Sequence, residues 1–140
     1  MNPDPILSDE AKLVAARRGV GDLAQKMGIE ILELSAERAV ATMPVEGNTQ
    51  PRGLLHGGAY LVLGETLGSF AANVWAGENA YAVGIEISAS HSKSATKGKV
   101  TGVATAISLG KTLTVHEIVV TNDQGERCST IRITNLIRRN

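Results

Sequence analysis

The feature that most constrains the fold is a run of twenty residues, Gly57–Ala76, in which almost every side chain is apolar or small. Its length suits either a helix that crosses a bilayer or one that lies in the core of a globular domain. Four glycines, Glu65 and Asn73 interrupt the run, no basic cluster flanks it, and the rest of the chain has the pattern of a sheet. The run therefore predicts a buried helix of a soluble protein.

The composition supports that interpretation. The chain has 140 residues, of which 43% are hydrophobic and 20% charged, which is typical of one soluble globular domain spanning residues 1–140. The fourteen basic and fourteen acidic residues cancel, and only four side chains are Phe, Trp or Tyr. Neither a nucleic acid nor a membrane is therefore expected as a partner.

The single cysteine and the N-terminus bear on the compartment. Cys128 can form no intrachain disulfide, which favours a reducing compartment, and its strand-like surroundings favour a small core residue over a nucleophile. The first residues, MNPDPILSDEAK, lack the basic and apolar regions of a signal peptide. We expect a cytoplasmic protein.

The remaining segments predict an α+β domain. Residues 1–27 form an N-terminal helical segment, with Ser8 as the N-cap of a helix to about Arg18 and a shorter helix over 23–27. Short turns at 109–111 and 122–125 join the last strands, which favours an antiparallel meander wrapped around the long helix. Six stretches have strand character: 28–34, 38–45, 82–90, 99–108, 112–121 and 127–138.

A period of 3.6 residues separates the long helix into two faces. The bulkier side chains lie opposite Glu65 and suit packing on a concave sheet: Tyr60, Leu63, Leu67, Phe70, Ala71 and Val74. The Glu65 face is rich in small residues, and we expect it to meet a subunit interface and to line a cleft: Gly58, Leu61, Val62, Gly68, Ser69 and Ala72.

Glu65 is an isolated carboxylate in an apolar helix, which is costly unless the charge has a partner or a purpose. One explanation is structural, an ion pair with Arg52 or Arg132. The other is catalytic. On the helix pattern alone both explanations stay open.

The residues around the start of the helix favour the catalytic explanation. His56, Gly57 and Gly58 precede the helix, where unpaired amides and the helix dipole can hold an oxyanion, although two glycines can also serve only as a sharp turn. Glu65 follows two turns later as a candidate base, and Ser69 lies on its face and can hold a water. With the amide of Gln50 in the preceding loop, the set is typical of acyl-transfer chemistry.

The series Gln50-x5-His56-Gly57-Gly58-x6-Glu65-x3-Ser69 resembles the hotdog-fold acyl-CoA thioesterases. The similarity is to the PaaI-like group, with the Glu-type 4-hydroxybenzoyl-CoA thioesterases and the EntH proofreading branch. It covers roughly residues 27–137 and extends to VGIEISASHSKSATKGKV and HEIVVTNDQGERCSTIRI. The resemblance implies a hotdog fold, an antiparallel sheet around one central helix, and homodimers that commonly pair into homotetramers, with active sites at the dimer interface.

The resemblance also implies residue roles. Glu65 acts as nucleophile or general base, and the amide of Gly57, next to Gly58, polarises the thioester carbonyl. Gln50 orients substrate or water, His56 supports the thioester end of the acyl group, and Ser69 assists the water. His91 matches a histidine near the acyl site; it is equally well explained as a surface histidine at a strand end.

Charge is distributed unevenly along the chain. Residues 1–90 hold eleven acids and six bases, whereas residues 91–140 hold three acids and eight bases. Because coenzyme A carries several phosphates, this basic excess has a candidate partner, although each lysine alone is better explained as an ordinary solvated side chain. The candidate residues for the nucleotide end are Lys93, Ser94, Lys97, Lys99 and Lys111.

The sequence thus predicts hydrolysis of an acyl-CoA thioester with an aryl or medium-length acyl chain. No cofactor and no metal are expected, because coenzyme A is part of the substrate. The alternative is a non-catalytic acyl-CoA-binding hotdog protein, against which the presence of both Glu65 and Gln50 argues. A hotdog dehydratase or hydratase is a further alternative, but its arrangement of a catalytic His and an acid is not found in the chain.

Overall fold

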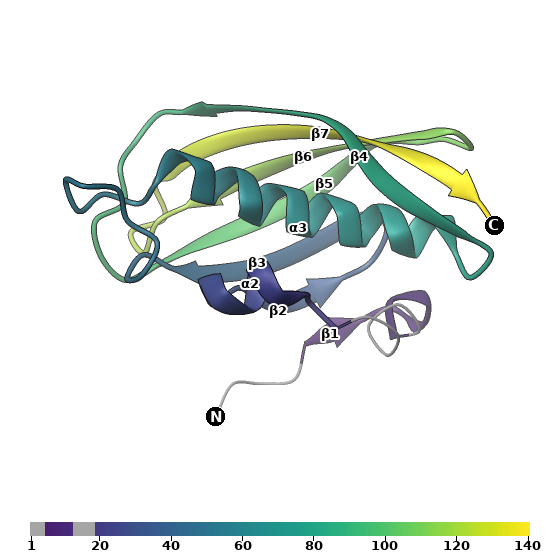
Figure 1. Ribbon diagram of the computed structural model, residues 1–140, viewed down its shortest axis with the longest axis horizontal. Helices are drawn as coiled ribbons and strands as arrows, with labels where there is room; N and C mark the ends of the chain where they lie inside the picture. Colours follow the sequence, from purple (N-terminus) through teal and green to yellow (C-terminus); the bar gives the residue numbers. More distant parts are fainter. Residues whose placement is uncertain (1–4, 13–18) are drawn as a thin grey trace.

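The apolar run forms one continuous helix, α3 (Gly57–Ala76), at the centre of the molecule (Figure 1). The computed structural model describes residues 5–12 and 19–140. No helix in this described part is both long and apolar enough to cross a membrane. A second, short helix is α2 (Asp22–Met27), and the strands are β1 (Ile6–Leu7), β2 (Glu30–Leu34), β3 (Arg38–Pro44), β4 (Ala80–His91), β5 (Lys99–Leu109), β6 (Leu113–Thr121) and β7 (Arg127–Arg139).

The strands form one curved sheet in the order β1-β2-β3-β5-β6-β7-β4, and α3 lies along its hollow (Figure 1). All neighbours are antiparallel except β1 and β2. This is the predicted hotdog arrangement, a sheet wrapped around one helix in an α+β domain.

Two details of the predicted sheet are wrong. The first is the meander of the last four strands: β5, β6 and β7 are consecutive, but β4 pairs with β7 at the edge. The connector over residues 92–98 therefore makes no tight turn. It runs past β7 and β6 to reach β5, which lies beside β3. The second is β1, two residues that pair with β2 and that no sequence pattern indicated.

The described part of the predicted helical segment 1–27 is only partly helical, because β1 lies within it. Ser8 Oγ accepts a hydrogen bond from the amide of Ala11 at 3.1 Å, as an N-cap does. The predicted continuation to about Arg18 lies outside the described residues. The second helix is confirmed as α2.

The bulky face of α3 packs on the sheet as predicted. Leu63 and Leu67 are fully buried and lie over Gly102 of β5, where a methyl group would come within 2.9 Å of Leu67 Cδ1. Large side chains of the helix thus fit onto small residues of the sheet, which lets the helix approach the strands closely.

The prediction that Gly68 and Ala72 leave room for a ligand or another chain is wrong. Both are buried, and a methyl group at Gly68 would lie 2.4 Å from Cγ2 of Ile133. Ala72 packs with Ala80, Ala82 and Ile137. The small residues serve the close approach of α3 to β7 and β4, and so they do not form an open cleft.

His116, to which the sequence assigned no role, belongs to the core. It is fully buried, and its Nε2 donates to the carbonyl oxygen of Ala36 at 2.8 Å. Burial lowers the pKa of the ring, so the imidazole is held neutral.

Candidate active site

The N-terminus of α3 is capped by His56. The backbone of His56 is extended, with φ −61° and ψ 133°, and its Nδ1 accepts from the amide of Gly58 at 2.9 Å. The amide of Ala59 donates to the His56 carbonyl. In the described part of the chain, the amide of Gly57 is therefore left without a protein acceptor. Because Nδ1 is an acceptor, the neutral His56 ring carries its proton on Nε2.

A cavity of about 370 Å³ opens at this end of α3. It brings together five of the residues that the sequence proposed, from the loop before α3, the start of α3 and the end of β4: Gln50, Gly57, His91, Lys93 and Ser94. Four other lining residues were not predicted from the sequence, because only their place in the fold distinguishes them: Leu54, Leu55, Tyr60 and Ser92.

The side chain of Gln50 is oriented by its own loop. Its Oε1 accepts hydrogen bonds from the amides of Arg52 and Leu54. With the oxygen turned back to the loop, the two N–H donors of the amide are left for the cavity. Gln50 can therefore donate to a carbonyl oxygen or to a water.

His91 faces the start of α3. Its Nδ1 lies 2.9 Å from Oγ of Ser129, and its ring packs against Tyr60 with centroids 4.9 Å apart. Its Nε2 lies on the side of Gly57, 3.2 Å from where a Cβ would stand. Burial raises the pKa of Tyr60 to about 12, so its phenol stays protonated beside the ring.

Glu65 lies elsewhere in the same chain. Its side chain is exposed beside the edge strand β4, and Oε2 lies 2.8 Å from where a Cβ would stand on Gly84. Glu65 lies eight positions after Gly57 in the helix, about 12 Å along the axis. It lines its own cavity of about 260 Å³ with residues of β4 and β7: Gly84, Ile85, Glu86, Ile87 and Ile133.

The structural explanation for Glu65 is not supported in the described residues. None of their ion pairs includes Glu65, so neither Arg52 nor Arg132 neutralises it. One turn later, Ser69 donates from Oγ to Oδ1 of buried Asn135 at 3.4 Å. The hydroxyl of Ser69 is thus directed at β7.

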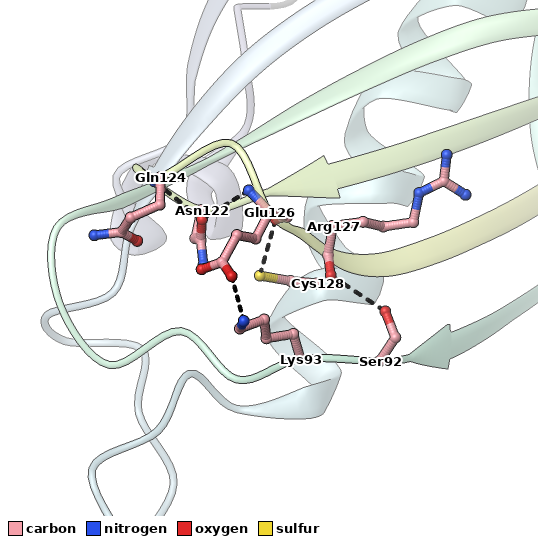
Figure 2. A network of polar contacts seen from close by, with 7 residues as sticks. All are labelled: Ser92, Lys93, Asn122, Gln124, Glu126, Arg127 and Cys128. Atoms are coloured by element: carbon pink, nitrogen blue, oxygen red, sulfur yellow. Dashed lines mark hydrogen bonds and ion pairs between the residues drawn. The ribbon is translucent and has the colours of Figure 1, made fainter.

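The segment after β4 is tied to the turn between β6 and β7 (Figure 2). Lys93 forms an ion pair with Glu126, and Asn122 donates to the same carboxylate at 3.1 Å. These hydrogen bonds lower the pKa of the Glu126 carboxyl, and the hydrogen bond from Lys93 has the larger effect. Lys93 therefore lines the cavity with its charge already partnered.

Hydrogen bonds also join the first residues of β7 to this segment. The amide of Ser92 donates to the carbonyl of Cys128 at 2.8 Å. The hydroxyl of Ser92 donates to the carbonyl of Arg127 at 3.3 Å (Figure 2). Cys128 is fully buried, and burial raises the pKa of its thiol, as suits the predicted core residue. The end of β4 is thus held firmly on β7.

The other candidate lysines are not gathered at the cavity. Lys97, Lys99 and Lys111 are exposed and do not line it. Lys111 follows Gly110, whose carbonyl accepts from Nε1 of Trp75 at the opposite end of α3. Within residues 5–12 and 19–140, no group of His, Cys, Asp and Glu side chains is placed to hold a metal ion.

Comparison with known proteins identifies the family. Residues 52–129, which include the start of α3, Glu65 and His91, match the thioesterase superfamily. The chain belongs to the thioesterase superfamily. It is a thioester hydrolase with the hotdog fold.

Individual relatives agree. The chain is 44% identical over 119 residues to the proofreading thioesterase EntH of Cronobacter turicensis, covering 84% of this chain and 87% of that protein. Among solved structures, a Haemophilus influenzae thioesterase superposes with a TM-score of 0.81 at 33% identity, covering 91% of this chain and 87% of the other. A Pseudomonas aeruginosa thioesterase, crystallised as a Gln-to-Ala variant, gives 0.81 at 32% identity over 100% and 97% of the two chains.

Proposed function

We propose that the protein hydrolyses an acyl-CoA thioester with an aryl or medium-length acyl chain, releasing the free acid and coenzyme A. The observation that carries the proposal is the cavity at the start of α3. There the free amide of Gly57, the donors of Gln50 and the ring of His91 converge. Donors placed around one point stabilise the negative charge that develops on a thioester oxygen.

The acid comes from a second copy of the chain. Within one chain, Glu65 and Gly57 line separate cavities, so no single substrate pose reaches both. Strand β4 is at the edge of the sheet, with Ile85 exposed, and an exposed edge offers unpaired amides and carbonyls to another strand.

A two-fold axis at Ser88, near the middle of β4, would complete the site. Antiparallel pairing of β4 with its copy there, together with the irregularity between Gly84 and Glu86, sets Gly84 of one subunit opposite His91 of the other. Because Glu65 lies beside Gly84 and the Gly57 cavity lies beside His91, each dimer then holds two sites that combine both cavities. A homodimer is thus the smallest active form, and we propose that two dimers pair as a homotetramer.

The chemistry follows from these positions. The thioester carbonyl accepts a hydrogen bond from Gly57, while Gln50 and Nε2–H of His56 orient the acyl end or the water. Glu65 of the partner subunit either removes a proton from an attacking water or attacks the carbonyl carbon itself to give a mixed anhydride that water then opens. Ser69, one turn from Glu65, assists that water. The carbon–sulfur bond breaks, and the coenzyme A thiolate leaves and takes up a proton.

The basic residues after β4 are candidates for binding the nucleotide end of the substrate. Lys93 and Ser94 line the cavity, and Lys97 and Lys99 are exposed on the connector that follows. We propose that this connector binds the phosphates of coenzyme A in a cytoplasmic enzyme. Lys93 then exchanges Glu126 for a phosphate, and Lys111 contributes only if the partner subunit brings it to the site.

Release of free thiol from a panel of acyl-CoAs tests the proposal. We expect the wild-type protein to release coenzyme A from aryl and medium-chain thioesters in a thiol-reactive dye assay, and long-chain thioesters to react more slowly. Binding of these thioesters with no thiol release from any of them would contradict hydrolysis and favour the non-catalytic acyl-CoA-binding alternative.

A further inference from the structure

The ring of His91 is held on three sides, although the residue lies at the exposed end of a strand. Oγ of Ser129 contacts Nδ1 at 2.9 Å, Tyr60 packs against the ring, and Gly57 lies beside Nε2. A surface side chain normally keeps its rotamer freedom, because fixing it costs entropy. The ring is therefore ordered before any substrate binds.

The register of the sheet supplies the contact with Ser129. His91 and Ser129 are directly opposite in the ladder between β4 and β7, so their side chains share one face of the sheet. Hydrogen bonds just beyond this pair, from Ser92 to the carbonyl of Arg127 (Figure 2) and to that of Cys128, hold the two strands together. The serine thus has little freedom to move away from the ring.

Burial decides the direction of the hydrogen bond. Ser129 is fully buried, and within the described residues Nδ1 of His91 is the only partner of its hydroxyl. If Nδ1 carried the proton and donated it, the hydroxyl proton of Ser129 would have no acceptor in the interior. A buried donor without an acceptor is costly, whereas a hydroxyl that donates to Nδ1 leaves neither group unsatisfied. The neutral ring then carries its proton on Nε2.

We propose that Ser129 is a positioning residue that keeps His91 in the tautomer with its proton on Nε2 and directs this N–H into the cavity beside the amide of Gly57. Two donors, one from the backbone and one from a side chain, then lie side by side for the thioester oxygen. This catalytic consequence rests on the proposed function, whereas the position of the proton does not.

Nitrogen NMR tests the proton position without reference to catalysis. In ¹⁵N-labelled protein, long-range proton–nitrogen correlations distinguish protonated from unprotonated ring nitrogens, and the signals of His91 are those lost in His91→Gln. We expect an unprotonated Nδ1 shifted by an accepted hydrogen bond and a protonated Nε2. Ser129→Ala should remove that shift, and Ser129→Thr should keep it. A protonated Nδ1 in the wild type, or a Nδ1 signal unchanged in Ser129→Ala, would overturn the proposal.

A double-mutant cycle tests the consequence for hydrolysis. Loss of one neutral hydrogen bond predicts a roughly 3- to 10-fold lower kcat in Ser129→Ala, restored by Ser129→Thr. In a His91→Gln background, Ser129→Ala should have no further effect, because the serine acts only through the ring. The control is Thr130→Ala, next to Ser129 but on the other face of β7, which should keep its turnover.

Equal losses from Ser129→Ala in both backgrounds would overturn the positioning role and indicate general damage to the fold, which thermal unfolding detects independently. If the protein hydrolyses none of the thioesters offered, the proposed function fails, and the NMR measurement still decides the role of Ser129 on its own.

Discussion

We expect replacement of Glu65 with Gln to lower kcat for acyl-CoA hydrolysis by roughly 10²- to 10⁴-fold, the usual contribution of a catalytic acid or base. Glutamine keeps the shape of the side chain but can neither accept the proton of water nor attack a carbonyl. Because Glu65 is exposed and makes no ion pair with the described residues, its loss should change the stability by less than about 0.5 kcal/mol. Steady-state kinetics and thermal unfolding measure the two effects.

The matched control is Glu78→Gln, which removes another exposed glutamate just beyond the end of α3 and should leave kcat unchanged. Near-normal turnover in Glu65→Gln would show that the carboxylate has no part in the chemistry. A large loss accompanied by a lower unfolding temperature would instead support the structural explanation of this residue.

The two possible actions of Glu65 leave different products. In a single turnover in isotope-labelled water, direct attack transfers labelled oxygen into the Glu65 carboxylate when the anhydride opens at that side. A general base leaves the carboxylate unlabelled and places the label only in the released acid. Mass spectrometry of the peptide that contains Glu65 reads out the difference.

Replacing Gly57 with Pro should cause the second largest decrease in activity. We expect kcat to fall about 10²- to 10³-fold, as it does when an oxyanion-hole donor is removed. Proline has no amide hydrogen but suits the first position of a helix. The residue before it must be extended, and His56 already has φ −61° and ψ 133°. The variant should therefore fold with α3 intact, which circular dichroism can verify.

Gly57→Ala is the control for this experiment, because alanine keeps the amide hydrogen and adds only the Cβ. That Cβ would lie 3.2 Å from Nε2 of His91, so a smaller loss is expected from displacement of the ring. The difference in kcat between the proline and alanine variants isolates the N–H donor. If both variants lose the same amount, the amide of Gly57 does not hold the oxyanion.

Local patterns in the sequence were sufficient for the central helix and for most of the strands. The apolar run Gly57–Ala76 has the length and composition of a buried helix, and in β6 inward residues alternate with outward ones along the strand. Such signals depend on neighbours in the chain. The pairing partner of β4 does not depend on neighbours in the chain. Nothing in the connector over 92–98 indicates that β4 pairs with β7, and the predicted meander was wrong for that reason.

Five of the residues that line the cavity at the start of α3 were predicted from the sequence, but their arrangement was not. The order of Gln50, His56, Gly57 and Glu65 along the chain indicated acyl transfer, because each residue type carries part of that chemistry. That Gly57 and Glu65 line two separate cavities was not visible in the spacing. Nor was Ser129, whose contact with His91 exists only because β7 lies beside β4.

The role of the small residues shows the same limit. Helical periodicity placed Gly68 and Ala72 on the face of Glu65, and a stripe of small residues is compatible with an open cleft or with close packing. The isoleucines of β7 decide between these, since Ile133 fills the space over Gly68. Which strand covers a helix face is a tertiary property that periodicity cannot supply.

We propose above that hydrolysis needs the Gly57 cavity of one subunit and Glu65 of its partner. Co-expression of Glu65→Gln and Gly57→Pro chains with different tags, followed by purification on both, gives mixed dimers that test it directly. We expect each variant alone to be nearly inactive and the purified assemblies to recover between roughly a quarter and a half of the wild-type turnover, because each mixed dimer has one intact site and a tetramer can also contain unmixed dimers. Assemblies as inactive as the two single variants would contradict the claim. If each site lay within one subunit, every site in a mixed dimer would contain one of the two substitutions.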